Sequence, residues 1–216
     1  MTTGDGSNDD FKRAMVVTAH PDDAEYGCSG SVAKWCRMGW EVVYVLCTDG
    51  SKGSEDREIT SKRLVEIRAE EQINAGKTLG LKTVEFLGYP DGYLEPTLDV
   101  RRDISRQIRK HKPDVLITTN PTRDLMSSGY VGHPDHFAAG EAALSAVFPS
   151  ARDHLTFPEL FSDEGLEPHK VREVWVMTFG DGADFWNPLT EQDVDTSIAA
   201  LKEHTSQVND PDQAAK

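Results

Sequence analysis

Two short motifs in the sequence combine histidine with carboxylates at spacings that suit metal binding. The first, His20-Pro21-Asp22-Asp23, places His20 and Asp23 three residues apart, and such a separation puts two side chains on one face of a helical turn. Both side chains could therefore hold one ion. Asp22 lies between them and must point another way, which leaves its carboxylate free to act on a water held by that ion.

The second motif, Gly132-His133-Pro134-Asp135-His136, repeats the three-residue separation with two histidines. One histidine could complete the coordination while the other faces the reacting centre. Two His ligands and one Asp leave the open position that catalytic zinc sites keep for water. Each motif alone is more often a turn or helix cap, because Asp and Pro favour those places. Two such motifs after strands of one predicted sheet favour a metal site.

Short apolar runs alternate with longer stretches of helical periodicity along the whole chain. This order predicts a Rossmann-like α/β fold, a mostly parallel sheet with helices on both faces. The predicted strands are Ala14–Ala19, Glu41–Cys47, Thr83–Leu87, Val115–Thr119 and Val171–Thr178. The predicted helices are Ser29–Met38, Thr60–Leu79, Leu98–His111, Pro134–Phe148 and Thr190–Gln207.

The loops that follow the predicted strands carry the unusual residues. His20 follows the first strand, Asp49 the second and Asp91 the third, and a long loop that ends in the second motif follows the fourth. Ligands of open parallel sheets bind beyond the carboxyl ends of the strands. We therefore expect the active site at that edge. Gly80, directly after the helix predicted to end at Leu79, is a helix stop signal.

Length and composition predict one globular domain that spans residues 1–216, with flexible ends at about 1–12 and 209–216. The chain has 23 Lys and Arg residues and 37 Asp and Glu residues, which gives a formal charge of -14. This charge disfavours nucleic acid and anionic membranes as partners.

No apolar run approaches the roughly 20 residues of a membrane span. The acidic start of the chain lacks the pattern of a secretory signal, so we expect a cytoplasmic protein.

The two motifs resemble those of the PIG-L/LmbE family of zinc-dependent N-deacetylases, and further positions from about Ala14 to Gln207 extend the likeness. These are Gly27 and Gly30, Thr48-Asp49-Gly50, and Arg68-x-x-Glu71-x-x-x-Ala75-x-x-x-Leu79-Gly80. The chain departs from the family pattern in having Ala24 before Glu25, where many members have Glu directly after the two aspartates.

The resemblance implies a role for each residue of the motifs. His20, Asp23 and His136 would bind zinc, and Asp22 would be the general base. His133 would stabilise the oxyanion and protonate the leaving amine, with Asp135 keeping its imidazole charged and oriented. The implied reaction is hydrolysis of the acetamide of an N-acetylated amino sugar, such as an N-acetylglucosamine conjugate, to acetate and a free amine.

Other residues are weaker candidates for the site. Arg68, expected on the exposed edge of its helix, and Asp49 could each bind a substrate hydroxyl. Tyr130 could add a hydroxyl to the oxyanion site, although packing is the more common role. Three histidines outside the motifs are expected to be structural or solvated: His111, His154 and His169. His204 suggests no role by itself.

Three alternatives remain open from the sequence. A nucleotide-dependent Rossmann enzyme is disfavoured, because His-Pro-Asp-Asp stands where dinucleotide binding requires Gly-x-Gly-x-x-Gly. A non-catalytic metal- or carbohydrate-binding domain would need neither Asp22 nor His133. The metal could also be iron, cobalt or another divalent ion, since a site of two His and one Asp accepts several. A homo-oligomer is possible.

Overall fold

Helices and strands alternate in the computed structural model, which describes residues 11–123, 131–178 and 182–208. In chain order the elements are β1 (Arg13–Thr18), α1 (Asp23–Gly27), α2 (Ser29–Arg37), β2 (Glu41–Thr48), α3 (Ser61–Leu79), β3 (Thr83–Tyr89), α4 (Leu98–His111), β4 (Val115–Thr118), α5 (Pro134–Ser145), a π-helical segment η1 (Ala146–Ser150), α6 (Glu159–Ser162), β5 (Glu173–Val176) and α7 (Glu191–Leu201).

The five described strands form one parallel sheet in the order β3-β2-β1-β4-β5. β1 lies at the centre, where it pairs with β2 from Arg13 to Thr18 and with β4 from Ala14 to Val17. The predicted α/β fold with a parallel sheet is confirmed. Because the crossover from β3 returns to the far side of β1, the order of the sheet reverses between β1 and β4, and this switch point is where such sheets bind ligands.

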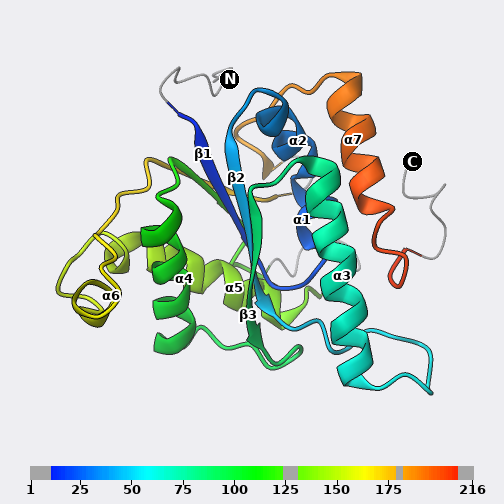
Figure 1. Cartoon of the computed structure of the whole chain (residues 1–216), viewed down its shortest axis with the longest axis horizontal. Helices are drawn as coiled ribbons and strands as arrows, with labels where there is room; N and C mark the ends of the chain where they lie inside the picture. The colour runs from blue at the N-terminus through cyan, green and yellow to red at the C-terminus, as the bar shows by residue number, and fades with distance from the viewer. Residues whose placement is uncertain (1–10, 124–130, 179–181, 209–216) are drawn as a thin grey trace.

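Helices cover both faces of the sheet (Figure 1). α4 and α5 pack on one face, where Ile104 and Ala139 meet Val17 and Val45 of the strands. On the other face α2, α3 and α7 form the cover, and Trp35 belongs to their core cluster. Strands covered on both faces need apolar residues along their whole length, which explains the continuous apolar runs in β1, β2 and β4.

Helix ends follow local signals in most places. Thr60 caps α3 by accepting a hydrogen bond from the Arg63 amide, and Gly80 ends that helix in the left-handed conformation, as predicted. Thr190 begins α7 with a capping box.

Some element boundaries differ from the prediction, among them those of the strand predicted at Val171–Thr178, which is β5 at Glu173–Val176. The helix predicted to reach Phe148 is α-helical only to Ser145, because η1 contains Pro149 and a non-helical Phe148. The last predicted helix ends at Leu201 instead of Gln207, and α1 was not predicted. It is short and begins at a residue with an unusual backbone conformation, so no periodic pattern marks it.

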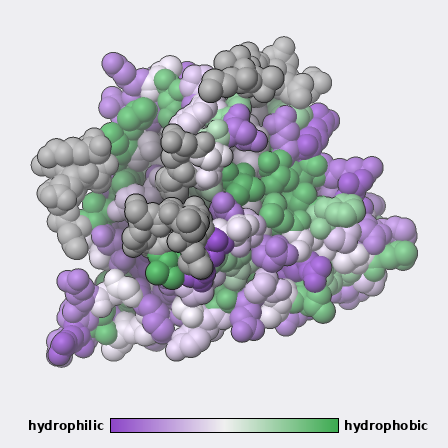
Figure 2. Space-filling model, turned by 180° about the vertical axis from the view of Figure 1, so that it is seen from behind, coloured by the Kyte–Doolittle hydropathy of each residue, from purple (hydrophilic) through white to green (hydrophobic). Residues whose placement is uncertain are grey.

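The described surface is mainly hydrophilic, with some exposed apolar side chains. Val174 and Val176 of β5 are partly exposed at the edge of the sheet, and Figure 2 shows a group of apolar side chains among hydrophilic ones on the face seen from behind. Of the N-terminal segment expected to be flexible, Phe11 is buried and the Lys12 amide donates a hydrogen bond to Asp114. Residues 1–10 and 209–216 lie outside the described ranges. Within the described ranges, no helix has the length and apolar character to cross a membrane.

Candidate metal centre

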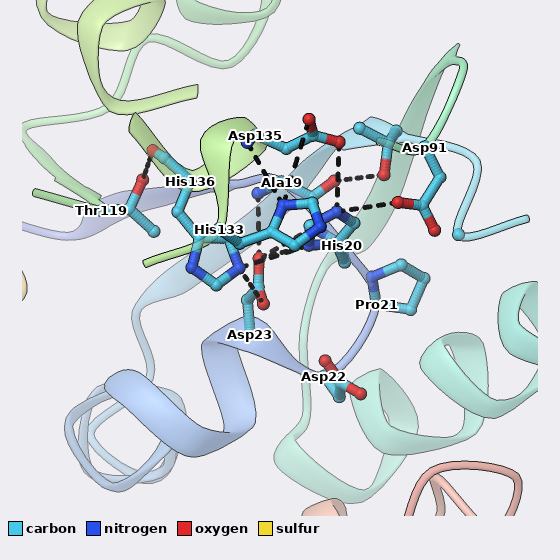
Figure 3. Close-up of polar contacts among 12 residues, drawn as sticks. Ala19, His20, Pro21, Asp22, Asp23, Asp91, Thr119, His133, Asp135 and His136 are labelled. Atoms are coloured by element: carbon cyan, nitrogen blue, oxygen red, sulfur yellow. Dashed lines mark hydrogen bonds and ion pairs between the residues drawn. The ribbon is translucent and has the colours of Figure 1, made fainter. Parts of the chain in front are cut away.

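Three side chains from distant parts of the chain converge at the carboxyl ends of β1 and β4 (Figure 3). His20 follows β1, Asp23 is the first residue of α1, and His136 lies in the first turn of α5. The Nε2 atom of His136 lies 3.0 Å from Asp23 Oδ1 and 3.3 Å from His20 Nδ1. His20 Nδ1 lies 3.5 Å from Asp23 Oδ2. The structure therefore brings together donors that are more than one hundred residues apart.

The separations match what one metal ion requires. A tetrahedral zinc ion with ligands at about 2.0–2.1 Å holds neighbouring ligand atoms about 3.3 Å apart. The two imidazole nitrogens here lie 3.3 Å apart, and each faces a different oxygen of Asp23, His136 Nε2 at 3.0 Å from Oδ1 and His20 Nδ1 at 3.5 Å from Oδ2. Two imidazoles and a carboxylate also suit zinc or iron chemically. Two overlapping groups of described residues have single ligand atoms close enough together to hold an ion: His20 with His133 and His136, and His20 with Asp91 and Asp135. Asp23 is in neither group, and it contacts His20 and His136 through separate oxygens.

Asp23 is oriented by the backbone of its own loop. Its Oδ2 atom accepts hydrogen bonds from the amides of Ala19 (3.1 Å) and His20 (2.8 Å), so that Oδ1 faces His136. Burial alone would raise the pKa of Asp23, but hydrogen bonds with His136 and His20 outweigh it and hold this pKa well below its usual range. Asp23 is therefore a carboxylate, the form that binds metal.

His20 is held by carboxylates on its other nitrogen. Its Nε2 atom lies 3.1 Å from Asp91 Oδ1 and 3.3 Å from Asp135 Oδ2, which leaves Nδ1 toward His136. Burial lowers the pKa of His20, yet the contacts with Asp23 and Asp91 outweigh burial and raise it to about 10. A metal ion would therefore have to displace the proton from Nδ1 when it binds. A carboxylate that fixes the outer nitrogen of an imidazole is the usual support of a metal-ligating histidine.

Asp135 makes its closest side-chain contacts with groups other than His133, and its expected support of the His133 imidazole stays a prediction. Its carboxylate accepts hydrogen bonds from the amides of Gly92 (2.7 Å) and Leu94 (3.2 Å) and contacts His20, whereas His133 Nδ1 lies 4.0 Å from Asp135 Oδ1. Asp135 is fully buried, so both oxygens need partners, and the loop after β3 supplies them.

His133 instead accepts a hydrogen bond from the backbone amide of Asp135, at 3.2 Å through Nδ1, and so caps α5. Its ring meets that of His20 edge-on, with centroids 4.6 Å apart. Burial lowers the pKa of His133, and the charge of His20 lowers it further. The ring is therefore neutral near pH 7 and carries its proton on Nε2.

Asp22 stands beside the three donors and has a different environment. Its backbone has a φ of 89°, in the left-handed region, and its side chain makes no cap to α1. Figure 3 shows it apart from the imidazole rings, below Asp23 and Pro21 in this view. Burial raises the pKa of Asp22 to about 6, against the opposing charge of Arg68, whose Nη2 lies 3.3 Å away. A carboxylate with such a pKa can accept a proton near neutral pH.

Comparison with known proteins assigns the chain to a family. The family model PIG-L, described as GlcNAc-PI de-N-acetylase, matches residues 15–147, more than half of the chain. The chain belongs to the PIG-L family. Both motifs lie inside the matched range, and so do all the donor atoms described above.

Relatives of this PIG-L protein include named deacetylases. A diacetylchitobiose deacetylase of Thermococcus kodakarensis is 34% identical over 165 residues, which are 76% of this chain and 59% of that protein. A second relative is the 1D-myo-inositol 2-acetamido-2-deoxy-alpha-D-glucopyranoside deacetylase 2 of Saccharopolyspora erythraea. It is 28% identical over an alignment that includes 90% of this chain and 83% of that protein.

The fold of the PIG-L chain also matches a solved structure. The structure of N,N′-diacetylchitobiose deacetylase from Pyrococcus horikoshii superposes with a TM-score of 0.81 at 28% identity, covering 92% of this chain and 72% of that one.

Arg68 of this PIG-L protein is buried, at 4% exposure, so its predicted place on the exposed edge of its helix is wrong. Its guanidinium donates to the carbonyls of Pro21 (2.8 Å), Gly50 (3.3 Å) and Lys52 (3.2 Å), and to the Asp22 carboxylate. Five donors in a fixed fork suit such a carbonyl-rich position. The structure thus makes Arg68 a tie between the loops after β1 and β2.

Asp49 lies in the loop after β2 and organises the loop after β3. Its Oδ1 atom accepts from the amides of Ser51 (3.0 Å) and Asp91 (3.2 Å). Asp91 in turn faces His20, so Asp49 acts on the centre through Asp91. The sequence predicts that Asp91 lies in a loop after a strand, and that position is the only signal of its place at the centre.

The remaining candidates lie elsewhere. Tyr130 is outside the residues that the structure describes. His111 contacts Glu85, and His169 contacts the carbonyl of Pro113, both away from the centre. His204 is fully buried, 3.4 Å from Glu25 Oε2.

Proposed function

We propose that the protein is a metal-dependent amidase that removes the acetyl group of an N-acetylglucosamine conjugate. The observation that carries this proposal is the convergence of His20 Nδ1, the two Asp23 oxygens and His136 Nε2, with contacts of 3.0–3.5 Å, next in the chain to the half-buried carboxylate of Asp22. A metal centre with an adjacent base of near-neutral pKa suits hydrolysis of an unactivated amide.

His20, Asp23 and His136 are proposed as the metal ligands and zinc as the metal. The alternative group with Asp91 and Asp135 is less suitable, because backbone amides already occupy both oxygens of Asp135. His133 is less suitable than Asp23, because its Nδ1 atom accepts the Asp135 amide and its ring is the most exposed of the three histidines. When bound, a divalent ion would polarise the amide carbonyl and lower the pKa of a water to about 7.

Asp22 is proposed to take the proton of the attacking water. Its raised pKa makes it a stronger base than an exposed aspartate, and Arg68 keeps it ionised at neutral pH by lowering the pKa that burial alone would produce. General base catalysis contributes roughly 10²–10⁴ in rate. Asp22 is proposed to return this proton to the nitrogen of the leaving amine when the C–N bond breaks, which balances the protons of the hydrolysis.

His133 is proposed to stabilise the oxyanion. Its Nδ1 atom is the acceptor for the Asp135 amide, so Nε2 bears the proton and can donate a hydrogen bond. With Asp91, Asp135 would also hold His20 as a ligand, since both carboxylates contact His20 Nε2.

The names of the relatives support the substrate class. They act on diacetylchitobiose or on an N-acetylglucosamine linked to inositol, so N-acetylglucosamine attached to a second polar group is the feature that these names share. Because the chain spans 59% of the Thermococcus protein, we extend only this shared feature to it.

The test is acetate release from N,N′-diacetylchitobiose and from an N-acetylglucosaminyl inositol, with the purified protein loaded with zinc. We expect turnover that a chelator abolishes and that zinc restores. Tight zinc binding without acetate from any N-acetyl amino sugar would favour the non-catalytic binding domain. A cytoplasmic location and a homo-oligomer remain predictions, as does the absence of a nucleic acid partner.

A further inference from the structure

Asp22 occupies a backbone conformation that needs support. A residue with a side chain rarely adopts a φ of 89°, and such conformations persist when surrounding contacts over-determine them. Asp22 makes no side-chain cap to α1 that would provide the support. The contacts that hold it must therefore come from elsewhere.

One of these contacts comes from Gln72 on α3. The side-chain oxygen of Gln72 accepts a hydrogen bond from the Asp22 amide at 3.1 Å, and Gln72 is fully buried. An amide side chain can present either its oxygen or its nitrogen, and only the oxygen can accept from the Asp22 amide. The contact therefore depends on which way the Gln72 amide is turned.

Glu25 on α1 determines that orientation. Its Oε1 atom accepts a hydrogen bond from Gln72 Nε2 at 3.0 Å, so the nitrogen of Gln72 faces Glu25 and its oxygen faces the Asp22 amide. Glu25 is itself buried, at 4% exposure, and its other oxygen lies 3.4 Å from Nε2 of His204, which is fully buried. A buried chain of hydrogen bonds thus runs from Glu25 through Gln72 to the amide of Asp22, and His204 lies against its outer end.

We propose that Gln72 and Glu25 are positioning residues that hold Asp22 where it serves as the base; this inference rests on the proposed function. Among the described contacts, neither side chain touches His20, Asp23 or His136, so their effect on the reaction must pass through Asp22. A shift of about 1 Å in a reacting group can cost roughly 10²-fold in rate.

The first experiment replaces Gln72 with methionine, which has a similar volume and makes neither hydrogen bond. We expect kcat for N,N′-diacetylchitobiose to fall roughly 10–100-fold, with KM and zinc content within about twofold of wild type. The control is Gln107→Met on α4, which applies the same change on the other side of the sheet and should leave kcat unchanged.

The same substitution in an Asp22→Ala background separates positioning from a general structural role. If Gln72 acts through Asp22, Gln72→Met should cause no further loss of the residual kcat there. An equal loss in both backgrounds would overturn the proposal, and so would an unchanged kcat in the single variant.

A second pair of variants exchanges the donor and the acceptor. Gln72→Glu keeps an acceptor for the Asp22 amide but sets two carboxylates against each other, so kcat should fall. Adding Glu25→Gln restores a donor opposite the new carboxylate and should recover at least tenfold of the loss. A double variant no better than Gln72→Glu would contradict the proposal, even where Gln72→Met does not fold.

If the wild-type protein were inactive, the proposed function would be refuted, and the positioning of Asp22 by Gln72 would have to be tested by structure. The crystal structure of Gln72→Met then decides it. We expect Asp22 to leave the positive-φ region, or its carboxylate to move away from Arg68. An unchanged Asp22 would show that Gln72 is not needed to hold it.

Discussion

Two buried arginines donate hydrogen bonds to loop carbonyls at opposite edges of the sheet. Arg68 donates to three carbonyls in the loops after β1 and β2. Arg109, in the last turn of α4, is fully buried and donates to four carbonyls, those of Ser150, Ala151, Asp153 and Thr156. Each guanidinium ties together loop segments that would otherwise leave carbonyls without partners.

The difference lies in what else surrounds each guanidinium. Arg68 Nη2 contacts the Asp22 carboxylate at 3.3 Å, and its Nη1 lies 3.9 Å from Asp91, beside the candidate metal centre. All hydrogen bonds described for Arg109 go to main-chain carbonyls between Ser150 and Thr156. A nearby histidine, His169, contacts the carbonyl of Pro113 just before β4. Burial of a charged residue is therefore no sign of function by itself; its neighbours decide.

The largest effect expected at the centre follows removal of a proposed ligand. His136→Ala should abolish acetate release and lower bound metal from about one ion per chain to near zero, because one donor of three is lost. Elemental analysis after removal of loosely held ions measures this. The matched control, His154→Ala, changes an exposed histidine and should keep the metal. Full metal content in the His136 variant would refute the ligand assignment.

The next largest effect is loss of the base. Asp22→Asn should lower kcat by roughly 10²–10⁴, equivalent to about 3–5 kcal/mol of activation free energy, with zinc retained. Steady-state acetate release and elemental analysis of the same preparation check both parts. A variant with its zinc in place and near-normal turnover would exclude Asp22 as the base.

Arg109 and Arg68 should separate stability from catalysis. Arg109→Met should lower the free energy of unfolding by about 2–4 kcal/mol, because buried carbonyls lose their donors, and should leave kcat unchanged. Arg68→Met should lower both quantities. Denaturant unfolding with metal held constant measures the first, and Arg106→Met, a half-buried position on α4, should cost less than about 1 kcal/mol. Equal loss of kcat in the Arg68 and Arg109 variants would remove the distinction between the two regions.

The smallest effect expected is a shift in the pH profile. Asp22 must be ionised to act as the base, so the rate should rise with pH through about 6, the pKa of Asp22. Arg68 lowers this pKa, and its removal should raise the pKa and move the rising limb of kcat to higher pH. The profile of Arg68→Met against that of Arg109→Met measures the shift, and coincident profiles would exclude Arg68 as a determinant of the base.

The fold could be predicted from the sequence because the signals for its elements are local. The continuous apolar runs of β1 and β2, the cap at Thr60 and the stop at Gly80 each act within a few residues, so periodicity and capping rules identify them. The histidines and carboxylates of the centre were also recognisable, because the motifs lie after strands of one parallel sheet and such strand ends meet at one edge.

Only the tertiary structure decided which groups those side chains touch. Asp135 lies closer to His20 than to its neighbour His133, and Arg68 is buried under loops that its own helix does not reveal. Asp91 is held near His20 because its amide donates to the carboxylate of Asp49, which stands 42 residues earlier in the chain. No local sequence pattern marks this contact. Hydrogen-bond partners of buried groups depend on which distant loops meet, and burial makes each polar atom take the partner that packing brings near.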